Sequence, residues 1–179
     1  QAGKLGQHCE HVSEGCRNCW AEAHNHRCLP GNGTGLPFDR RSRELVDIVV
    51  DEAILGQPLK WRKPKLIAVQ LGSDLFGEWV PDALIHRVFR VMASCLERHV
   101  FLVLTKRARR ACEYREEFGE LGYLPNLGQK FGEIGYLPHL WYGVSAEDQW
   151  TYDERVAWLR KIPCARRFVS AEPLLGAIE

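Results

Sequence analysis

Three cysteines near the start of the chain have the spacing of a metal site. Cys9, Cys16 and Cys19 follow the pattern C-x6-C-x2-C. The two-residue gap lets one turn direct the thiolates of Cys16 and Cys19 at one point, and the six-residue loop can return Cys9 to the same point. Residues 1–29 are therefore predicted to bind a metal or an iron–sulfur cluster.

The number of ligands leaves two kinds of site open. A closed structural zinc site needs four protein ligands, whereas a cluster held by three cysteines keeps one iron free for a small molecule. An open iron–sulfur site is the favoured interpretation, a zinc site is the alternative, and three ordinary buried cysteines are the remaining one. The candidates for a fourth zinc ligand are His8, His11, His24, His26 and Cys28.

The rest of the chain predicts the elements that would position this site. Apolar runs typical of strands buried on both faces begin at residues 66–71 and recur at 99–104, 140–144 and 167–170. Helical patterns cover 20–27, 81–96, a segment ending near 117, and 149–161, and a short β-branched stretch lies at 45–50. Alternating strands and helices predict β/α architecture with a parallel sheet.

Polar side chains follow each of these four predicted strands. In a parallel β/α sheet, the carboxyl ends of the strands carry the active site. A carboxylate there can accept hydrogen bonds from an amine or ribose hydroxyls, and Lys106, with Arg107 beside it, can hold a carboxylate or phosphate. This set would suit a zwitterionic ligand that bears a nucleoside. The candidates for ligand binding are Ser73, Asp74, Lys106, Ser145, Glu147 and Glu172.

Composition limits the class of protein and its compartment. The 179 residues, 45% of them hydrophobic, predict one domain over 1–179 with a single core. Seven cysteines that are not spread like a disulfide framework favour a reducing cytoplasm. No run of eighteen apolar residues predicts a membrane span.

Net charge gives no general preference for polyanions. The chain carries 24 Lys and Arg against 23 Asp and Glu, a formal charge of +1, so any contact with nucleic acid must be local. The basic segment 60–65 is the candidate, with Trp61 as a stacking platform. Residues 118–127 recur as 131–140, which predicts a tandem insertion in a surface loop over 118–139, without functional value.

Six ordered stretches of the sequence resemble the phage gene product 37 / gene product 68 family, which is itself similar to radical S-adenosylmethionine proteins. The resemblance covers nearly the whole chain. Because the activity of that family is poorly defined, the resemblance implies more about fold and cofactor than about substrate. The matching stretches are residues 15–22, 58–64, 73–76, 104–107, 143–149 and 168–176.

The resemblance implies a partial (β/α) barrel in which Cys9, Cys16 and Cys19 hold a [4Fe-4S] cluster. The free iron would bind the amino and carboxylate groups of S-adenosylmethionine, and an electron from a reductant protein would release a deoxyadenosyl radical that abstracts hydrogen from an undefined substrate. The alternative functions are a zinc-stabilised module without catalysis and a phage accessory protein that binds nucleic acid.

Three features depart from the pattern that this resemblance implies. Radical S-adenosylmethionine enzymes usually space their cysteines as C-x3-C-x2-C, whereas the first gap here has six residues. The segment before Cys9 lacks the Trp-Asn-Pro and Thr-Gly elements, which removes or alters the opening strand. The chain also stops before the further strands of the family, so the barrel is expected to be truncated on its C-terminal side.

Overall fold

A four-stranded parallel sheet forms the centre of the computed structural model, which describes residues 4–5, 7–27, 33–48, 50–96, 98–118 and 136–179. The strands are adjacent in the order of the sequence, and each pair is parallel. They are β3 (Leu66–Val69), β4 (Val100–Thr105), β5 (Leu140–Ser145) and β6 (Arg166–Ser170). The predicted α/β class with a parallel sheet is confirmed.

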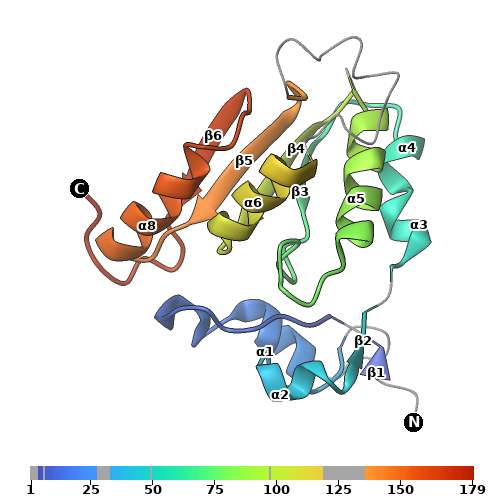
Figure 1. The fold of residues 1–179 in the computed structure, drawn as a ribbon. Helices are drawn as coiled ribbons and strands as arrows, with labels where there is room; N and C mark the ends of the chain where they lie inside the picture. The colour runs from blue at the N-terminus through green and yellow to red at the C-terminus, as the bar shows by residue number, and fades with distance from the viewer. Residues whose placement is uncertain (1–3, 6, 28–32, 49, 97, 119–135) are drawn as a thin grey trace.

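In the described part of the chain, three helices lie between these strands and cover one face of the sheet (Figure 1). They are α5 (Asp82–Ser94), α6 (Ala108–Phe118) and α8 (Gln149–Leu159). Because side chains alternate along a strand, Phe101 and Val103 of β4 point to the same side as Tyr142 of β5, and all three are buried under these helices. On α5, Ile85 and Phe89 repeat at helical spacing and enter the same core.

The opposite face of the sheet is more exposed than the sequence predicted. Leu66 of β3 is 62% exposed, and Leu102 and Trp141 on the same face are only half-buried. The prediction that residues 66–71 form a strand buried on both faces is therefore wrong. The physical reason is that α5, α6 and α8 pack on the other face, where Ile67 and Val69 of β3 lie against the core.

The N-terminal segment lies across the carboxyl ends of the sheet strands (Figure 1). It includes a two-stranded parallel ladder of β1 (Lys4–Leu5) and β2 (Val46–Asp47), and the 3-10 turn η1 (Glu14–Cys16). The helix predicted over 20–27 is confirmed as α1 (Trp20–His26), and the strand predicted over 45–50 is confirmed only as the short β2. The other helices among the described residues are α2 (Arg40–Arg43), α3 (Glu52–Leu55) and α4 (Gln57–Lys60).

Most of the duplicated segment predicted over 118–139, as well as Cys28, lies outside the described residues. Within the part of the chain that the structure describes, no helix combines the length and apolar character needed to cross a membrane.

Candidate functional site

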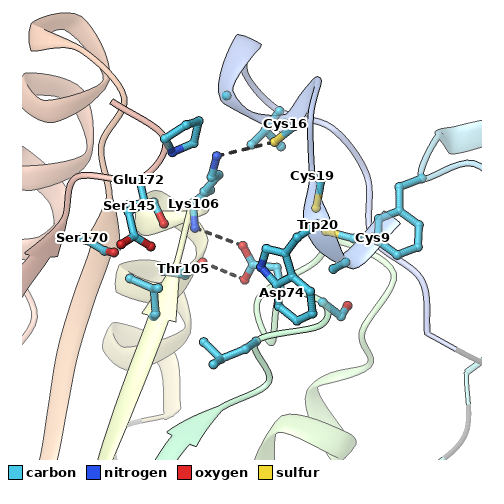
Figure 2. A pocket seen from close by; sticks show the side chains of 18 of the residues that line it. Cys9, Cys16, Cys19, Trp20, Asp74, Thr105, Lys106, Ser145, Ser170 and Glu172 are labelled. Atoms are coloured by element: carbon cyan, nitrogen blue, oxygen red, sulfur yellow. Dashed lines mark hydrogen bonds between the residues drawn. The ribbon is translucent and has the colours of Figure 1, made fainter. Parts of the chain in front are cut away.

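A cavity of about 490 Å³ lies between the cysteine loop and the carboxyl ends of the strands. Figure 2 shows the cysteines on one side of this cavity and the ends of β5 and β6 on the other. The wall therefore combines residues that are far apart in the sequence but that the sequence patterns had singled out. These are Cys9, Cys16 and Cys19 together with Ser73, Asp74, Lys106, Ser145 and Glu172.

The three cysteines of the cavity are free thiols, and each is half-buried. Cys9 Sγ lies 3.8 Å from the carbonyl oxygen of Glu10, and Cys16 Sγ lies 3.9 Å from the hydroxyl of Ser13. Burial, followed by the nearby charge of Asp74, raises the pKa of Cys9 to about 12. Binding a metal at Cys9 would therefore require the thiol to lose its proton, because the thiolate is the metal ligand.

The described residues contain no group of three His, Cys, Asp or Glu side chains placed to hold a single metal ion. A tetrahedral zinc with bonds of about 2.3 Å to sulfur would draw its ligand sulfurs to within about 4 Å of one another. A cluster does not require its cysteine sulfurs to lie this close to one another, because the cysteines bind different iron atoms. A cluster would need three thiols around one cavity, and the three half-buried cysteines line this one.

None of the histidines considered as a fourth zinc ligand lines the cavity. The ring of His8 is buried between Phe38 and Trp79, with ring centroids 5.9 and 5.3 Å away. His11 Nε2 lies 2.7 Å from a carboxylate oxygen of Glu22 on α1. His24 and His26 belong to α1 and are absent from the cavity wall.

Lys106, the first residue after β4, reaches the cysteine loop. Its Nζ lies 3.7 Å from Cys16 Sγ and also donates a hydrogen bond to the carboxylate of Glu147 (Figure 2 shows the contact with Cys16). Its backbone N–H donates to Asp74 Oδ2 at 3.1 Å. The ammonium group is therefore held beside a candidate ligand sulfur, where the sequence predicted a partner for a ligand carboxylate or phosphate.

Glu147, predicted to bind a ligand, lies behind the cavity wall instead of in it. Its side chain is only 1% exposed, and one carboxylate oxygen accepts hydrogen bonds from Ser13 Oγ at 2.7 Å, from Lys106, and from Arg155 Nη1 at 3.2 Å. Burial alone would raise the pKa of Glu147, but the hydrogen bonds from Lys106 and Ser13 and the charge of Arg155 outweigh it, so the pKa is lowered.

Gly15 packs directly against this buried carboxylate. A Cβ atom at position 15 would lie 2.5 Å from both Cγ and Cδ of Glu147, closer than real Cβ atoms approach other atoms. The cysteine loop can reach the sheet only because this residue has no side chain. Sequence reasoning did not identify Ser13, Gly15 or Arg155 as contributors to the site, and no local sequence signal relates them to Glu147.

Asp74 joins the ends of β3 and β4. Its buried carboxylate accepts hydrogen bonds from Thr105 Oγ1 at 2.7 Å, from the backbone N–H groups of Phe76 at 3.0 Å and Lys106 at 3.1 Å, and from Arg107 Nη1 at 3.4 Å. With four donors already in place, this carboxylate supports the wall of the cavity more than it offers acceptors to a ligand.

Arg107 connects the end of β4 to the first cysteine. Its Nη2 donates to the Glu10 carbonyl at 3.2 Å, its Nε donates to Glu78 at 2.7 Å, and its guanidinium stacks on Trp79 at 4.5 Å. Burial would lower the pKa of Arg107, but the charges of Asp74 and Glu78 outweigh it, so the pKa is raised. Arg107 is thus a buried structural cation, although it follows Lys106 in a run that the sequence placed at the ligand.

The side of the cavity at β5 and β6 keeps polar groups that face the open space. Ser145 and Ser170 are register partners at the ends of these strands, and Glu172 is exposed in the cavity wall. Gln70, directly after β3, also lines the cavity and has a φ of 56°, a left-handed conformation that is uncommon for a residue with a side chain. The groups available to a ligand therefore lie mainly opposite the cysteines.

The basic segment 60–65 lies at the other end of β3, before the strand begins, and does not contribute to the cavity. The Lys65 ammonium covers the Trp61 ring at 4.4 Å from its centroid, and the His99 ring packs against Trp61 at 6.0 Å. Trp61 is therefore held by Lys65 and His99, away from the cavity, and its role in nucleic-acid binding stays a prediction.

Comparison with known proteins identifies one family. Residues 6–179, which include the three cysteines and the sheet, match the family described as "Protein of unknown function (DUF5131)". No curated protein and no solved structure matches the chain significantly. On the match over residues 6–179, the chain belongs to the DUF5131 family of proteins of unknown function.

Proposed function

We propose that this chain is an iron–sulfur protein of the radical S-adenosylmethionine type with an undefined substrate, and that Cys9, Cys16 and Cys19 hold a [4Fe-4S] cluster. The observation that carries the proposal is the cavity in which these three free thiols face the carboxyl ends of a parallel sheet. The proposal includes the finer fold, a partial (β/α) barrel whose interior would be the exposed face of the sheet.

The ligand set supports a cluster over zinc. Among the described residues, which do not include Cys28, three cysteines and no histidine line the cavity, whereas a closed zinc site needs a fourth protein ligand. Three thiolates leave one iron of a cluster open to a small molecule. When bound, such a cluster would supply one electron for reductive cleavage of a carbon–sulfur bond of S-adenosylmethionine.

The residues opposite the cysteines would bind the remainder of the proposed ligand. Glu172 is an exposed carboxylate that can accept hydrogen bonds from an amine or from ribose hydroxyls. The hydroxyls of Ser145 and Ser170 can donate to, or accept from, polar groups of the same ligand. Asp74 and Arg107 would fix the wall around it, since their hydrogen bonds tie β4 to β3 and to the cysteine loop.

The first test is anaerobic reconstitution with iron and sulfide, followed by metal analysis and absorbance spectroscopy. We expect about four irons per chain in the wild type and loss of the cluster in Cys9→Ala, Cys16→Ala and Cys19→Ala. Cys95→Ala is the matched control, because Cys95 is buried in the core away from the cavity and should leave the iron content unchanged. One tightly bound zinc without colour would refute the proposal. A cluster that never cleaves S-adenosylmethionine would refute its radical part alone.

A further inference from the structure

We infer that Lys106 is a positioning residue that donates a hydrogen bond to the Cys16 thiolate and makes one-electron reduction of the bound cluster more favourable. The inference rests on the proposed function, because it concerns the cluster that Cys16 would help to hold. Its geometric basis is the distance of 3.7 Å between Lys106 Nζ and Cys16 Sγ, which is within hydrogen-bonding range for sulfur.

Both ends of the Lys106 residue are fixed, unlike those of an ordinary surface lysine. The backbone N–H is bound to Asp74 at 3.1 Å, and the ammonium is bound to the buried carboxylate of Glu147. The side chain is only 19% exposed. A lysine held in this way keeps its charge next to Cys16 without losing side-chain entropy when a cluster binds.

The local charge balance favours an effect on the cluster. Glu147 accepts hydrogen bonds from both Lys106 and Arg155, so one carboxylate faces two cations and the three groups carry a formal net charge of +1. Arg155 has a second carboxylate, Glu154, 3.9 Å from its Nε, but that carboxylate is 42% exposed and screened by solvent. Positive charge therefore remains beside Cys16 in the partly buried wall.

The effect of Lys106 on the cluster follows from the negative charge that the cluster gains on reduction. Taking up one electron from a reductant makes the cluster and its thiolates more negative by one charge, so a cation hydrogen-bonded to a ligand sulfur stabilises the reduced form more than the oxidised form. Removing the Lys106 ammonium should lower the equilibrium constant for reduction about tenfold, which corresponds to a fall of about 59 mV in midpoint potential for a one-electron couple.

The test is a redox titration of the reconstituted protein with dithionite, followed by electron paramagnetic resonance of the reduced cluster. Lys106→Met should lower the midpoint potential, and Lys106→Arg, which keeps a cationic donor, should restore most of it. Lys63→Met is the matched control, because Lys63 is exposed before β3 and its removal changes the net charge equally without affecting the cavity. Lys106→Gln is titrated in parallel, so that a variant without the ammonium can still be compared with the wild type if Lys106→Met does not hold a cluster.

The outcomes separate this inference from the proposed function. If all variants bind about four irons and Lys106→Met, Lys106→Gln and Lys63→Met share one midpoint potential, the role of Lys106 is refuted while the cluster stands. If the wild type binds no cluster at all, the proposed function fails and the inference fails with it. A lower potential in both neutral Lys106 variants, but not in Lys63→Met, supports the assignment.

Discussion

Replacing Gly15 with alanine tests how the cysteine loop is held against the sheet. The new Cβ would lie 2.5 Å from Cγ and Cδ of Glu147 and 2.7 Å from its Oε1. The Glu147 side chain cannot easily move aside, because Ser13, Lys106 and Arg155 all donate hydrogen bonds to it. The substitution should therefore push η1, with Cys16, away from the sheet.

The expected destabilisation of the docked loop in Gly15→Ala is the balance of three contributions to the free energy. Overpacking a buried contact costs about 1–3 kcal/mol. Weakening a hydrogen bond to a charged group adds up to about 1.5–3 kcal/mol. Replacing glycine by alanine returns about 0.4–1 kcal/mol by restricting the unfolded chain, since the backbone of Gly15 is not in a left-handed conformation. The net destabilisation of the docked loop should be about 2–3 kcal/mol.

Hydrogen exchange measures this local free energy directly. The amides of Cys16, Arg17 and Cys19 donate to backbone carbonyls within the loop, so they exchange when the loop opens. A cost of about 2 kcal/mol should accelerate their exchange about thirtyfold in Gly15→Ala. Iron content after reconstitution gives a second measurement, and we expect it to fall.

Gly72→Ala is the matched control, because Gly72 also lines the cavity. A Cβ there would meet only the amide end of the exposed Gln7 side chain, which can rotate away. This variant should change loop exchange by less than about threefold, or well under 1 kcal/mol. If Gly15→Ala exchanges at the wild-type rate and binds the same amount of iron, the docking of the loop on Glu147 is wrong.

Two further predictions test the strand ends and the core. Asp74→Asn should lower the free energy of unfolding by about 2–3 kcal/mol in urea denaturation, because it leaves buried donors, including Arg107, without a carboxylate. Glu78→Gln, at a carboxylate that is 66% exposed, should cost less than about 1 kcal/mol, and equal costs would contradict the role given to Asp74. Burial lowers the pKa of the His139 ring, although the hydrogen bond between the ring and the Met92 carbonyl oxygen at 2.8 Å opposes the shift. As the pH falls, the imidazole in the unfolded chain is therefore protonated at a higher pH than the imidazole in the folded protein. Stability should therefore fall as pH drops below about 6.5, and His139→Gln should flatten that slope. An unchanged slope in His139→Gln would show that the ring is not held neutral.

The order of the elements could be predicted from the sequence because each pattern depends on local physics. Apolar runs ending in polar residues became β3 to β6, and a helical period became α5. The pattern could not show which face of a strand is exposed to solvent. The apolar run at 66–71 is typical of a strand covered on both faces, but burial depends on elements elsewhere in the chain, and the helices that bury this sheet pack on the other face.

Much of the wall of the candidate cavity was predictable from the sequence, but the roles of its residues and their supporting contacts were not. Cysteine spacing and strand ends identified residues that do line one cavity. The role of Glu147 was not visible, because a carboxylate at a strand end is compatible with both ligand binding and burial. Its role depends on Ser13, which is 134 residues away in the sequence, and on Arg155 from the following helix.

The long first gap of the C-x6-C-x2-C pattern has a structural explanation in these contacts. The carbonyl of Glu10 accepts from Arg107, Ser13 donates to Glu147, and Gly15 packs against that same carboxylate. All three loop residues lie between Cys9 and Cys16, so the gap contains the segment that docks on the ends of β4 and β5.

A shorter gap could still direct three thiolates at one cluster, but it would lack the residues that make these contacts. The loop is also fixed just before Cys9, where Ser73 at the end of β3 donates to the His8 carbonyl. Three neighbouring strand ends thus hold the loop on both sides of its first cysteine. The departure from the usual spacing therefore fits the proposed cluster site, because the added residues position the three cysteines on the strand ends.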